Sequence, residues 1–221
     1  MRNLTNKIDS QGQGCLLTSE LIKLMNKEEL HDRIIVAPYL QEEQIGRDSI
    51  DIRLSGDLYI PSKIKASYLN PLDPIKFKKK SEKIRKHLKL DFGESFTIHP
   101  REFIIADSFE YVCLPKNVMA YLQGRSSWGR LGLVVHATAG IIHPSFHGIL
   151  TFELSNLGPI PIKLYPLMRI AQLVFHYGTG VYYKEQLKSQ FDSSILSKIP
   201  DFDFEVLRKI RDHRKKQLKK F

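Results

Sequence analysis

Apolar and polar residues alternate with a period of two over most of the middle of the chain. The alternation covers residues 49–54, 95–100, 102–114, 117–123, 133–139, 148–156, 160–165 and 169–177. Pro, Gly, Asn and Asp separate these runs at short intervals, which is typical of an all-β sandwich or barrel. The sequence therefore predicts a mainly β fold.

A helical period replaces this alternation near both ends of the chain. Residues 18–30 have leucines and a methionine at helical spacing after a cap at Thr18 or Ser19. Residues 203–221 indicate a basic helix whose apolar side holds Val206, Leu207 and Ile210. We expect one domain over residues 1–200 and a basic helical extension over residues 201–221.

Composition and cysteine usage favour a cytoplasmic, soluble protein. The chain has 221 residues, of which 42% are hydrophobic, so it can bury a sizeable core. No apolar run approaches the roughly 20 residues that span a bilayer, and the first residues lack the pattern of a signal peptide. Cys15 and Cys113 lie too far apart in the sequence to suggest a disulfide framework. We expect no association with a membrane.

The net charge of +10 is concentrated in two segments, residues 76–89 and 208–220. Each holds eight Lys or Arg and one acidic residue, so together they carry +14 and the rest of the chain −4. Such runs bind nucleic acid or acidic surfaces in some proteins, but more often they are solvated faces of exposed helices. A nucleic-acid partner is therefore not expected from the sequence.

The segment QGRSSWGRLG, residues 123–132, places two arginines and two serines between glycines. Guanidinium and hydroxyl groups supply the donors that phosphate oxygens accept. The same residues fit a strand that ends at Gln123 and turns through Gly124 into a short helix, capped by Ser126 or Ser127. A phosphate site and a capped helix are compatible with each other, because a helix start favours anions.

The run GILTFELSN, residues 148–156, carries the candidate acid. Alternation puts Leu150, Phe152 and Leu154 on one face of this strand, and Thr151, Glu153 and Ser155 on the other. A lone glutamate on the outer face of a strand is ordinary. Glu153, however, follows the hairpin-like segment 136–148, which lies close in sequence to the arginine–serine segment.

Several motifs recur together in an order that indicates a family. They are FGESFTIHPREF, LPKNVMAYLQGRSSWGRLGL and HATAGIIHPSFHGILTFELSNLGPIPIKLYPLMRIAQL, with SIDIRL upstream. Over residues 15–200 the chain resembles the dCTP deaminase branch of the dUTPase superfamily. The resemblance implies a distorted jelly-roll, dUTPase-like β-barrel that assembles as a homotrimer, with active sites at the subunit interfaces.

The resemblance also implies dCTP as the substrate and Glu153 as the catalytic acid/base. The triphosphate-binding segment would be Arg125, Ser126, Ser127, Trp128, Gly129 and Arg130. Further nucleotide contacts would come from Ala139, His143, Thr151, Phe152, Gln172 and Tyr183. Mg²⁺ would enter with the triphosphate. No zinc site is expected, because the two cysteines are isolated and no H-x-E motif occurs.

Two departures from the family pattern bear on the product. His143 stands where relatives usually have an aspartate, which favours deamination with release of dUTP. The tail offers Gln190, Phe191 and Ser194 where relatives have Lys, Tyr and Gln. Gly140 and Gln172 favour the alternative, a bifunctional enzyme that forms dUMP and pyrophosphate.

Two hypotheses outside catalysis also remain open at this point. One is a nucleotide-sensing member of the same fold, and the other is a nucleic-acid-binding protein built on the basic segments. Glu153 favours the enzyme over the sensor, since a sensor has no need of a group that exchanges protons.

Overall fold

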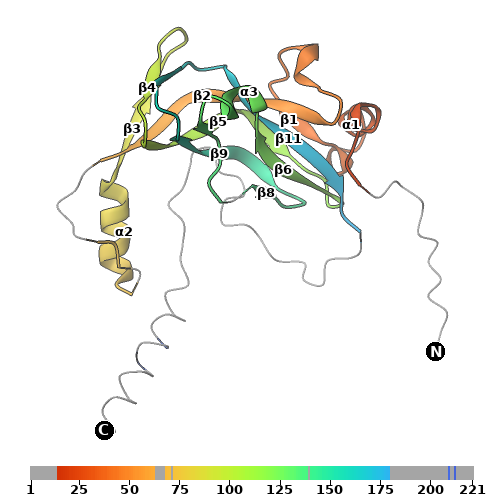
Figure 1. Ribbon diagram of the computed structural model, residues 1–221. Coiled ribbons are helices and arrows are strands. Elements are labelled where there is room, and N and C mark those ends of the chain that lie inside the picture. Colours follow the sequence, from red (N-terminus) through yellow and green to blue (C-terminus); the bar gives the residue numbers. More distant parts are fainter. Residues whose placement is uncertain are drawn as a thin grey trace.

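The protein is a strongly curled antiparallel sheet with a few short helices at its margins (Figure 1). This computed structural model describes residues 14–62, 68–70, 72–138 and 140–179, together with Lys209 and Asp212. The mainly β fold predicted from the alternation is confirmed. Most of the predicted C-terminal helix lies outside the described residues; Lys209 and Asp212 are both helical.

The main sheet is built on one continuous path of neighbouring strands. In order these are β7 (Leu133–Val134), β9 (His147–Asn156), β5 (Phe103–Cys113), β2 (Ser49–Pro61), β11 (Arg169–Tyr177), β6 (Val118–Gly124) and β8 (Ile141–Ile142). β1 (Ile35–Ala37) adds to β5, and β3 (Arg85–Lys89) adds to β2. β4 (Phe96–Ile98) and β10 (Ile162–Leu164) form a separate two-stranded sheet.

β2 joins the two halves of the sheet because it pairs with different strands along its length. Its first residues, Ser49–Arg53, pair with β11, whereas its later residues pair with β5 and β3. The register with β5 shifts between Leu54 and Leu58, and such a bulge bends a strand. The bend lets one strand serve both halves of the curled sheet.

The inner face of the sheet holds one apolar core. Phe152 of β9 and Phe175 of β11 are fully buried and are its largest side chains. On β9 the burial alternates as predicted: Leu150, Phe152 and Leu154 are buried, while Thr151 is exposed and Glu153 is half-buried. The core therefore fixes which face of β9 carries the candidate acid.

The first helix is shorter than the sequence predicted, and it is capped differently. α1 spans Thr18–Met25, and a separate 3₁₀ turn, η1 (Leu30–Asp32), follows it. The Thr18 hydroxyl instead donates to the carbonyls of Gly46 and Arg47, each at 2.8 Å. The predicted cap at Thr18 or Ser19 is therefore wrong, because Leu17 occupies that position without a side-chain bond.

The basic run at residues 76–89 folds into a helix and a strand. α2 spans Pro74–Lys83 and leads directly into β3. Asp73 caps the helix by accepting from the Lys76 amide at 3.1 Å, and Pro74 occupies its first turn. This part of the chain was expected to be a solvated face, and its division into α2 and β3 was not predicted.

The described helices contain no apolar stretch long enough to cross a bilayer.

Candidate active site

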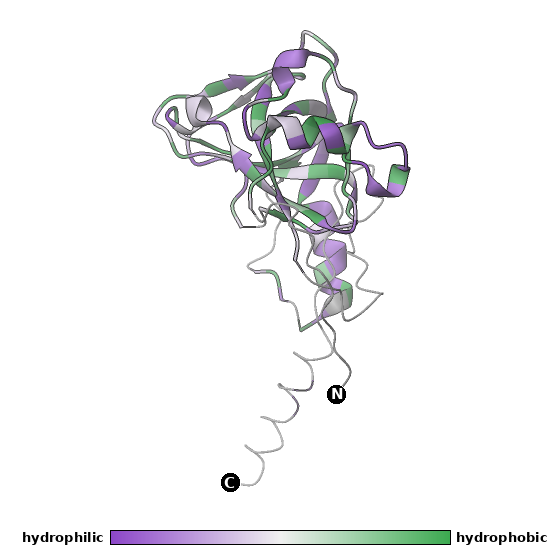
Figure 2. Cartoon of the chain, turned by 90° about the vertical axis from the view of Figure 1, so that its right-hand side faces the viewer, coloured by the Kyte–Doolittle hydropathy of each residue, from purple (hydrophilic) through white to green (hydrophobic). Residues whose placement is uncertain are grey.

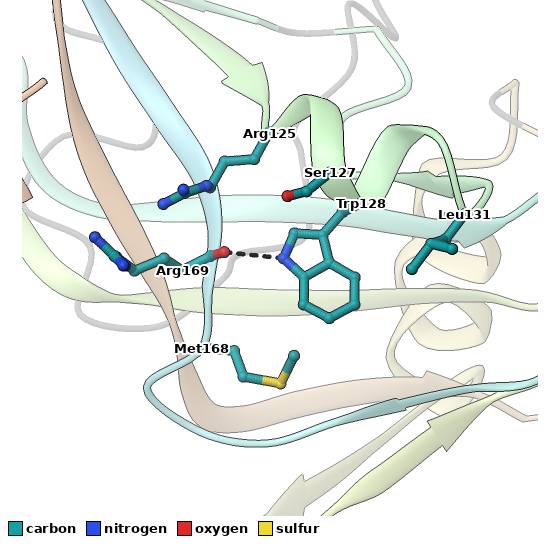
Figure 3. A pocket seen from close by; sticks show the side chains of 6 residues that line it. All are labelled: Arg125, Ser127, Trp128, Leu131, Met168 and Arg169. Atoms are coloured by element: carbon teal, nitrogen blue, oxygen red, sulfur yellow. Dashed lines mark hydrogen bonds between the residues drawn. The ribbon is translucent and has the colours of Figure 1, made fainter. Parts of the chain in front are cut away.

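A cavity of about 260 Å³ lies where α3 (Ser126–Gly129) meets the start of β11. Its lining residues are Arg125, Ser127, Trp128, Leu131, Met168 and Arg169. The two guanidinium groups lie at one end, and the indole, Leu131 and Met168 lie at the other (Figure 3). One end of the cavity is therefore cationic and the other is apolar.

The arginine–serine segment is a strand end followed by a single helical turn. β6 ends at Gly124, and the Arg125 amide donates to the Ile170 carbonyl of β11 at 3.2 Å. Arg125, not Ser126 or Ser127, is the N-cap residue of α3, and no side chain caps the turn. The short helix is thus confirmed and its predicted serine cap is wrong. The Ser127 hydroxyl is left at the cavity.

A side-chain hydrogen bond and a close backbone contact hold α3 against β11 and the loop after β9. The Trp128 indole nitrogen donates to the Arg169 carbonyl at 3.0 Å (Figure 3). Gly132, which follows α3, has φ +94°, and a Cβ on it would lie 2.3 Å from the Gly158 nitrogen. Glycine is required there because the two backbones touch and the backbone is left-handed.

Asp51 of β2 holds both arginines at the cationic end. Its Oδ2 accepts from Arg125 Nη1 and, at 3.2 Å, from Arg169 Nη1. Arg169 Nη1 also donates to the Glu43 carbonyl at 3.2 Å. Only 13% of the Asp51 side chain is exposed, so water screens these ion pairs weakly. One carboxylate facing two guanidinium groups leaves a net positive charge at this end of the cavity.

A buried polar network fixes the part of β2 that carries Asp51. Glu110 of β5 accepts from Arg53 Nη1 at 3.0 Å, from the Arg53 amide at 2.7 Å and from Gln44 Nε2 at 3.0 Å. The same Gln44 nitrogen donates to the Asp51 carbonyl at 2.9 Å. Burial raises the pKa of Glu110, although the bonds from Arg53 act in the opposite direction. The network therefore sets the position of the backbone beneath the two arginines.

Glu153 lies on the outer face of β9 and is held by the segment that follows β7. Its Oε2 accepts from the amides of Ala137 at 2.9 Å and Thr138 at 3.2 Å. Its own amide donates to the Val135 carbonyl at 2.9 Å. Among the described residues, no hydrogen bond reaches Oε1. One oxygen of Glu153 is therefore anchored, and the other can face a reactant.

A buried histidine nitrogen lies beside this segment. His136 Nδ1 has no hydrogen-bond partner among the described residues and is the one such buried side-chain atom found there. A Cβ on Gly140 would lie 3.2 Å from His136 Cε1, so glycine leaves space for the imidazole ring.

The structure brings together only some of the predicted site residues. Arg125, Ser127 and Trp128 line the cavity, whereas Ser126, Gly129 and Arg130 are exposed and do not. Gln172 lies on β11 opposite Asp51, in the same row as Gln123 of β6.

The other predicted residues lie away from the cavity lining or outside the described residues. His143 and Thr151 are exposed, and the buried Phe152 side chain belongs to the core, so only its backbone can meet a ligand. Glu153 is not among the lining residues of the cavity. Ala139 and Tyr183 lie outside the described residues, as do Gln190, Phe191 and Ser194.

Asp51 and Arg169 were not predicted as site residues. Both belong to predicted strands, SIDIRL and RIAQLVFHY, where a charged residue fits the ordinary alternation. Only the pairing of β2 with β11, and of β11 with β6, brings them to Arg125. Strand order is not visible in a single sequence, so the local pattern held no signal for this cluster.

The described part of the chain contains no cluster of side chains that could hold a metal ion by itself. No group of three or more His, Cys, Asp or Glu residues is close enough there to bind an ion. Asp51, the acid beside the cavity, is already engaged by two arginines. The cavity fits an anion, which could bring Mg²⁺ with it.

The curled antiparallel sheet defines a fold class shared with a known structure. The crystal structure of a dCTP deaminase from Agrobacterium tumefaciens has a TM-score of 0.57 at 22% identity, covering 75% of this chain and 49% of that one. At this identity the likeness concerns the fold alone.

The particular family follows from the sequence matches. A family model described as dCTP deaminase-like matches residues 16–178, and the chain belongs to that family of enzymes. A protein of Methanobrevibacter smithii named "dCTP deaminase, dUMP-forming" is 40% identical over 153 residues, which are 67% of this chain and 75% of that protein. A protein of Clavibacter michiganensis with the same name is 38% identical over 159 residues, covering 68% and 76%. The resemblance found in the sequence motifs is thereby confirmed.

Proposed function

We propose that this chain deaminates dCTP with Glu153 as acid/base, and that the product leaving the site is dUMP. The observation that carries the proposal is the anchoring of Glu153, whose Oε2 is held by two amides while Oε1 has no partner among the described residues. A carboxylate held in this way can exchange a proton with a reactant without changing its position.

The deamination step needs one group that takes a proton and then returns it. Glu153 accepts a proton from water, and the resulting hydroxide adds to C4 of the cytosine ring. The proton then passes to the amino nitrogen, the C4–N bond breaks and ammonia leaves. The C4 hydroxyl gives its proton to N3 and becomes the carbonyl of uracil, so one water is consumed and one ammonia is released.

The cationic end of the cavity suits the triphosphate. Arg125 and Arg169 present two guanidinium groups with one carboxylate between them, and charge-assisted bonds to phosphate are stronger than neutral ones. Ser127 adds a hydroxyl, and Trp128 offers an apolar surface beside them. Mg²⁺ bound to the triphosphate would neutralise part of its negative charge.

The catalytic carboxylate and the cation pair belong to separate clusters in one chain. Glu153 is held by the segment after β7, whereas Arg125 and Arg169 are held by Asp51 of β2. We infer that a complete site combines Glu153 of one subunit with the cavity of another, in a homotrimer. Such a closed ring would give three equivalent sites.

The names of the relatives support dUMP in place of the dUTP expected from the sequence. The two proteins at 40% and 38% identity are both called dUMP-forming. In the dUMP-forming reaction a second water attacks the α-phosphorus and the bond to the oxygen that bridges the α- and β-phosphates breaks. The products are dUMP and pyrophosphate. His143 gives a specific reason to keep dUTP release as the second candidate, because an imidazole replaces the expected carboxylate there.

Product analysis tests the proposal. The purified protein is incubated with dCTP and Mg²⁺ and without added zinc, and ammonia, dUTP, dUMP and pyrophosphate are measured separately. We expect ammonia, dUMP and pyrophosphate in equal amounts. Ammonia with dUTP alone would establish the second candidate, and the absence of ammonia would overturn deamination.

A matched pair of glutamate variants tests the role of Glu153. Glu153→Gln keeps the shape of the side chain and should abolish ammonia release while dCTP still binds within a few-fold of the parent affinity. Glu94→Gln is the control, because exposed Glu94 also accepts a backbone amide, that of Asp91 at 2.8 Å. Normal ammonia release by Glu153→Gln would reject the assignment.

A further inference from the structure

α2 and β3 form a basic arm, residues 73–89, that stands away from the cavity. In Figure 1 α2 lies below the sheet, whereas α3 lies on the upper side of the sheet. β3 is attached through its pairing with Asp57–Pro61, the last residues of β2. Leu90, the residue after β3, packs closely against Gly56 of β2. A Cβ on Gly56 would lie 2.2 Å from the Leu90 carbonyl oxygen, so glycine is required there.

The lysines of α2 form a stripe along one side of the helix. Lys76, Lys79, Lys80 and Lys83 follow one another at spacings of three, one and three residues. Residues three and four apart face the same side of an α-helix, so these four ammonium groups share one face. With a rise of 1.5 Å per residue, the stripe is about 10 Å long.

Few acidic groups of the described residues offset this charge. Asp73 pairs with Lys76 at 3.1 Å, and Lys80 lies over the Tyr68 ring at 5.9 Å. No described carboxylate is within ion-pair distance of Lys79 or Lys83. Glu82, the one acidic residue within α2, follows Lys79 by three residues but forms no ion pair with it. Like charges at these spacings destabilise a helix, so a bound polyanion would relieve a repulsion that the free protein retains.

The arm lacks the apolar face that a membrane-binding helix needs. Ile75 and Phe77 are separated by roughly 160° around the helix axis, so they cannot form one apolar stripe. Figure 2 shows α2 as mostly hydrophilic. Lys86 and Lys89 of β3, both exposed, continue the positive charge beyond the end of the helix. The surface therefore fits repeated negative charges on a hydrophilic chain.

We propose that the Lys76–Lys79–Lys80–Lys83 stripe binds the phosphodiester backbone of a nucleic acid. A stripe of this length contacts successive phosphates, whereas a single free phosphate would occupy only part of it. Contacts of this kind depend on charge and not on base sequence, so affinity falls steeply with salt. The interaction is separate from the nucleotide cavity.

Fluorescence anisotropy of labelled 20-nucleotide DNA, single-stranded and duplex, tests the proposal on the full chain between 50 and 200 mM salt. The variant carries Gln at positions 76, 79, 80 and 83; Gln is a good helix former and removes only the charges. The control carries Gln in place of the exposed Lys23, Lys27, Lys116 and Lys163, which changes the net charge equally.

The stripe variant should bind the single strand at least tenfold more weakly at 100 mM salt. Its plot of log affinity against log salt should be shallower by about 3, since each phosphate contact contributes about 0.7 to that slope. The control should stay within twofold of the parent, and both variants should deaminate dCTP at the parent rate, because none of these lysines belongs to the cavity or to Glu153.

Three results would overturn the proposal. The first is parent-like binding by the stripe variant, which would assign DNA binding to the other basic segment, residues 208–220. The second is equal loss in both variants, which would reduce the effect to net charge. The third is binding of the parent to vesicles containing phosphatidylserine but to neither DNA, which would make the arm a membrane contact.

Discussion

The Asp51 carboxylate accepts a hydrogen bond from Arg125, a residue 74 positions away in the chain. The same oxygen accepts from Arg169, so a single acid on β2 positions a cation from the β6–α3 turn and another from β11. Two guanidinium groups this close repel each other in the absence of the carboxylate. Asp51 thus makes an anion-binding pair possible in the free protein.

Replacing Asp51 with Asn should destabilise the free protein more than the ligand-bound protein. The partly buried Arg125 loses its charged partner, and we expect the free energy of unfolding to fall by about 1–3 kcal/mol. A bound triphosphate replaces the missing charge, so inorganic triphosphate should raise the Tm of Asp51→Asn more than that of the parent. Thermal unfolding with and without triphosphate measures both effects.

Asp57→Asn is the matched control for this prediction. Asp57 lies on the same strand and pairs with His87, and that pair is more exposed than the pair with Arg125. Its loss should change stability by less than about 1 kcal/mol and leave the triphosphate effect unchanged. Identical unfolding of Asp51→Asn and the parent would show that Asp51 does not hold the arginines in solution.

A mixture of two inactive variants should regain activity if sites are shared between subunits. Glu153→Gln and Arg125→Ala, co-expressed in equal amounts, form mixed trimers in which about a quarter of the sites combine two intact residues. We expect about that fraction of parental ammonia release, while each variant alone releases almost none. Light scattering on the parent should give the mass of three chains.

Activity of the mixture no higher than that of the single variants would place each complete site within one subunit. Melting curves of both variants serve as the control, because Arg125→Ala leaves Asp51 with only one of its two arginines. A folded Arg125→Ala protein with no recovery on mixing would contradict the shared site and leave the deamination chemistry untouched.

The strands were predictable from the sequence, but their neighbours were not. Each alternating run overlaps a strand, and RIAQLVFHY coincides with β11, but the run 49–54 covers only the first part of β2. β1 and β8 are too short to show a period, and β3 is hidden because its charges resemble those of an exposed helix. The start of α2 had a usable signal in Asp73 followed by Pro74, an N-cap residue before a first-turn proline.

The same holds for the candidate site: residues within one sequence motif could be predicted, and residues brought together by strand order could not. Glu153 and the segment from Arg125 to Trp128 are neighbours in sequence motifs, so motifs alone could indicate them. Asp51 and Arg169 join the site only through the order of strands β2, β11 and β6. The buried network of Glu110 could not be predicted, because its partners Gln44 and Arg53 come from other elements. In the sequence Glu110 is one polar residue in an alternating run.

Arg169→Ala should weaken substrate binding more than it slows the reaction. Loss of a charge-assisted bond to phosphate costs about 1.5–3 kcal/mol, which corresponds to a rise in KM of roughly 10- to 150-fold. Steady-state kinetics with dCTP measures KM and kcat separately. Exposed Arg47, replaced by Ala, is the control and should leave both parameters unchanged. A fall in kcat with constant KM would place Arg169 in the chemical step instead.

The contact between Tyr177 and Glu20 should make stability depend on pH in two separate windows. The Tyr177 hydroxyl donates to Glu20 Oε1 at 2.7 Å and joins α1 to β11. Burial, with the bond to Glu20, raises the pKa of Tyr177 from 10.0 to about 12, and the bond from Tyr177 lowers the pKa of Glu20 from 4.5. The contribution of Tyr177 is complete below pH 10 and disappears as the pH rises through about 12. The contribution of Glu20 is complete above its unfolded pKa and disappears as the pH falls through its lowered pKa.

Tyr177→Phe should therefore lose about 0.5–1.5 kcal/mol near pH 7, and the deficit should shrink on both the acid and the alkaline side. Urea unfolding of the parent and the variant at a series of pH values measures this difference. Tyr121→Phe is the control, since Tyr121 is half-buried against His176 and has no hydroxyl bond recorded among the described residues. A deficit that stays constant as the pH rises from 9 to 12 would mean that the variant loses packing and not this hydrogen bond, because packing carries no proton that titrates in that range.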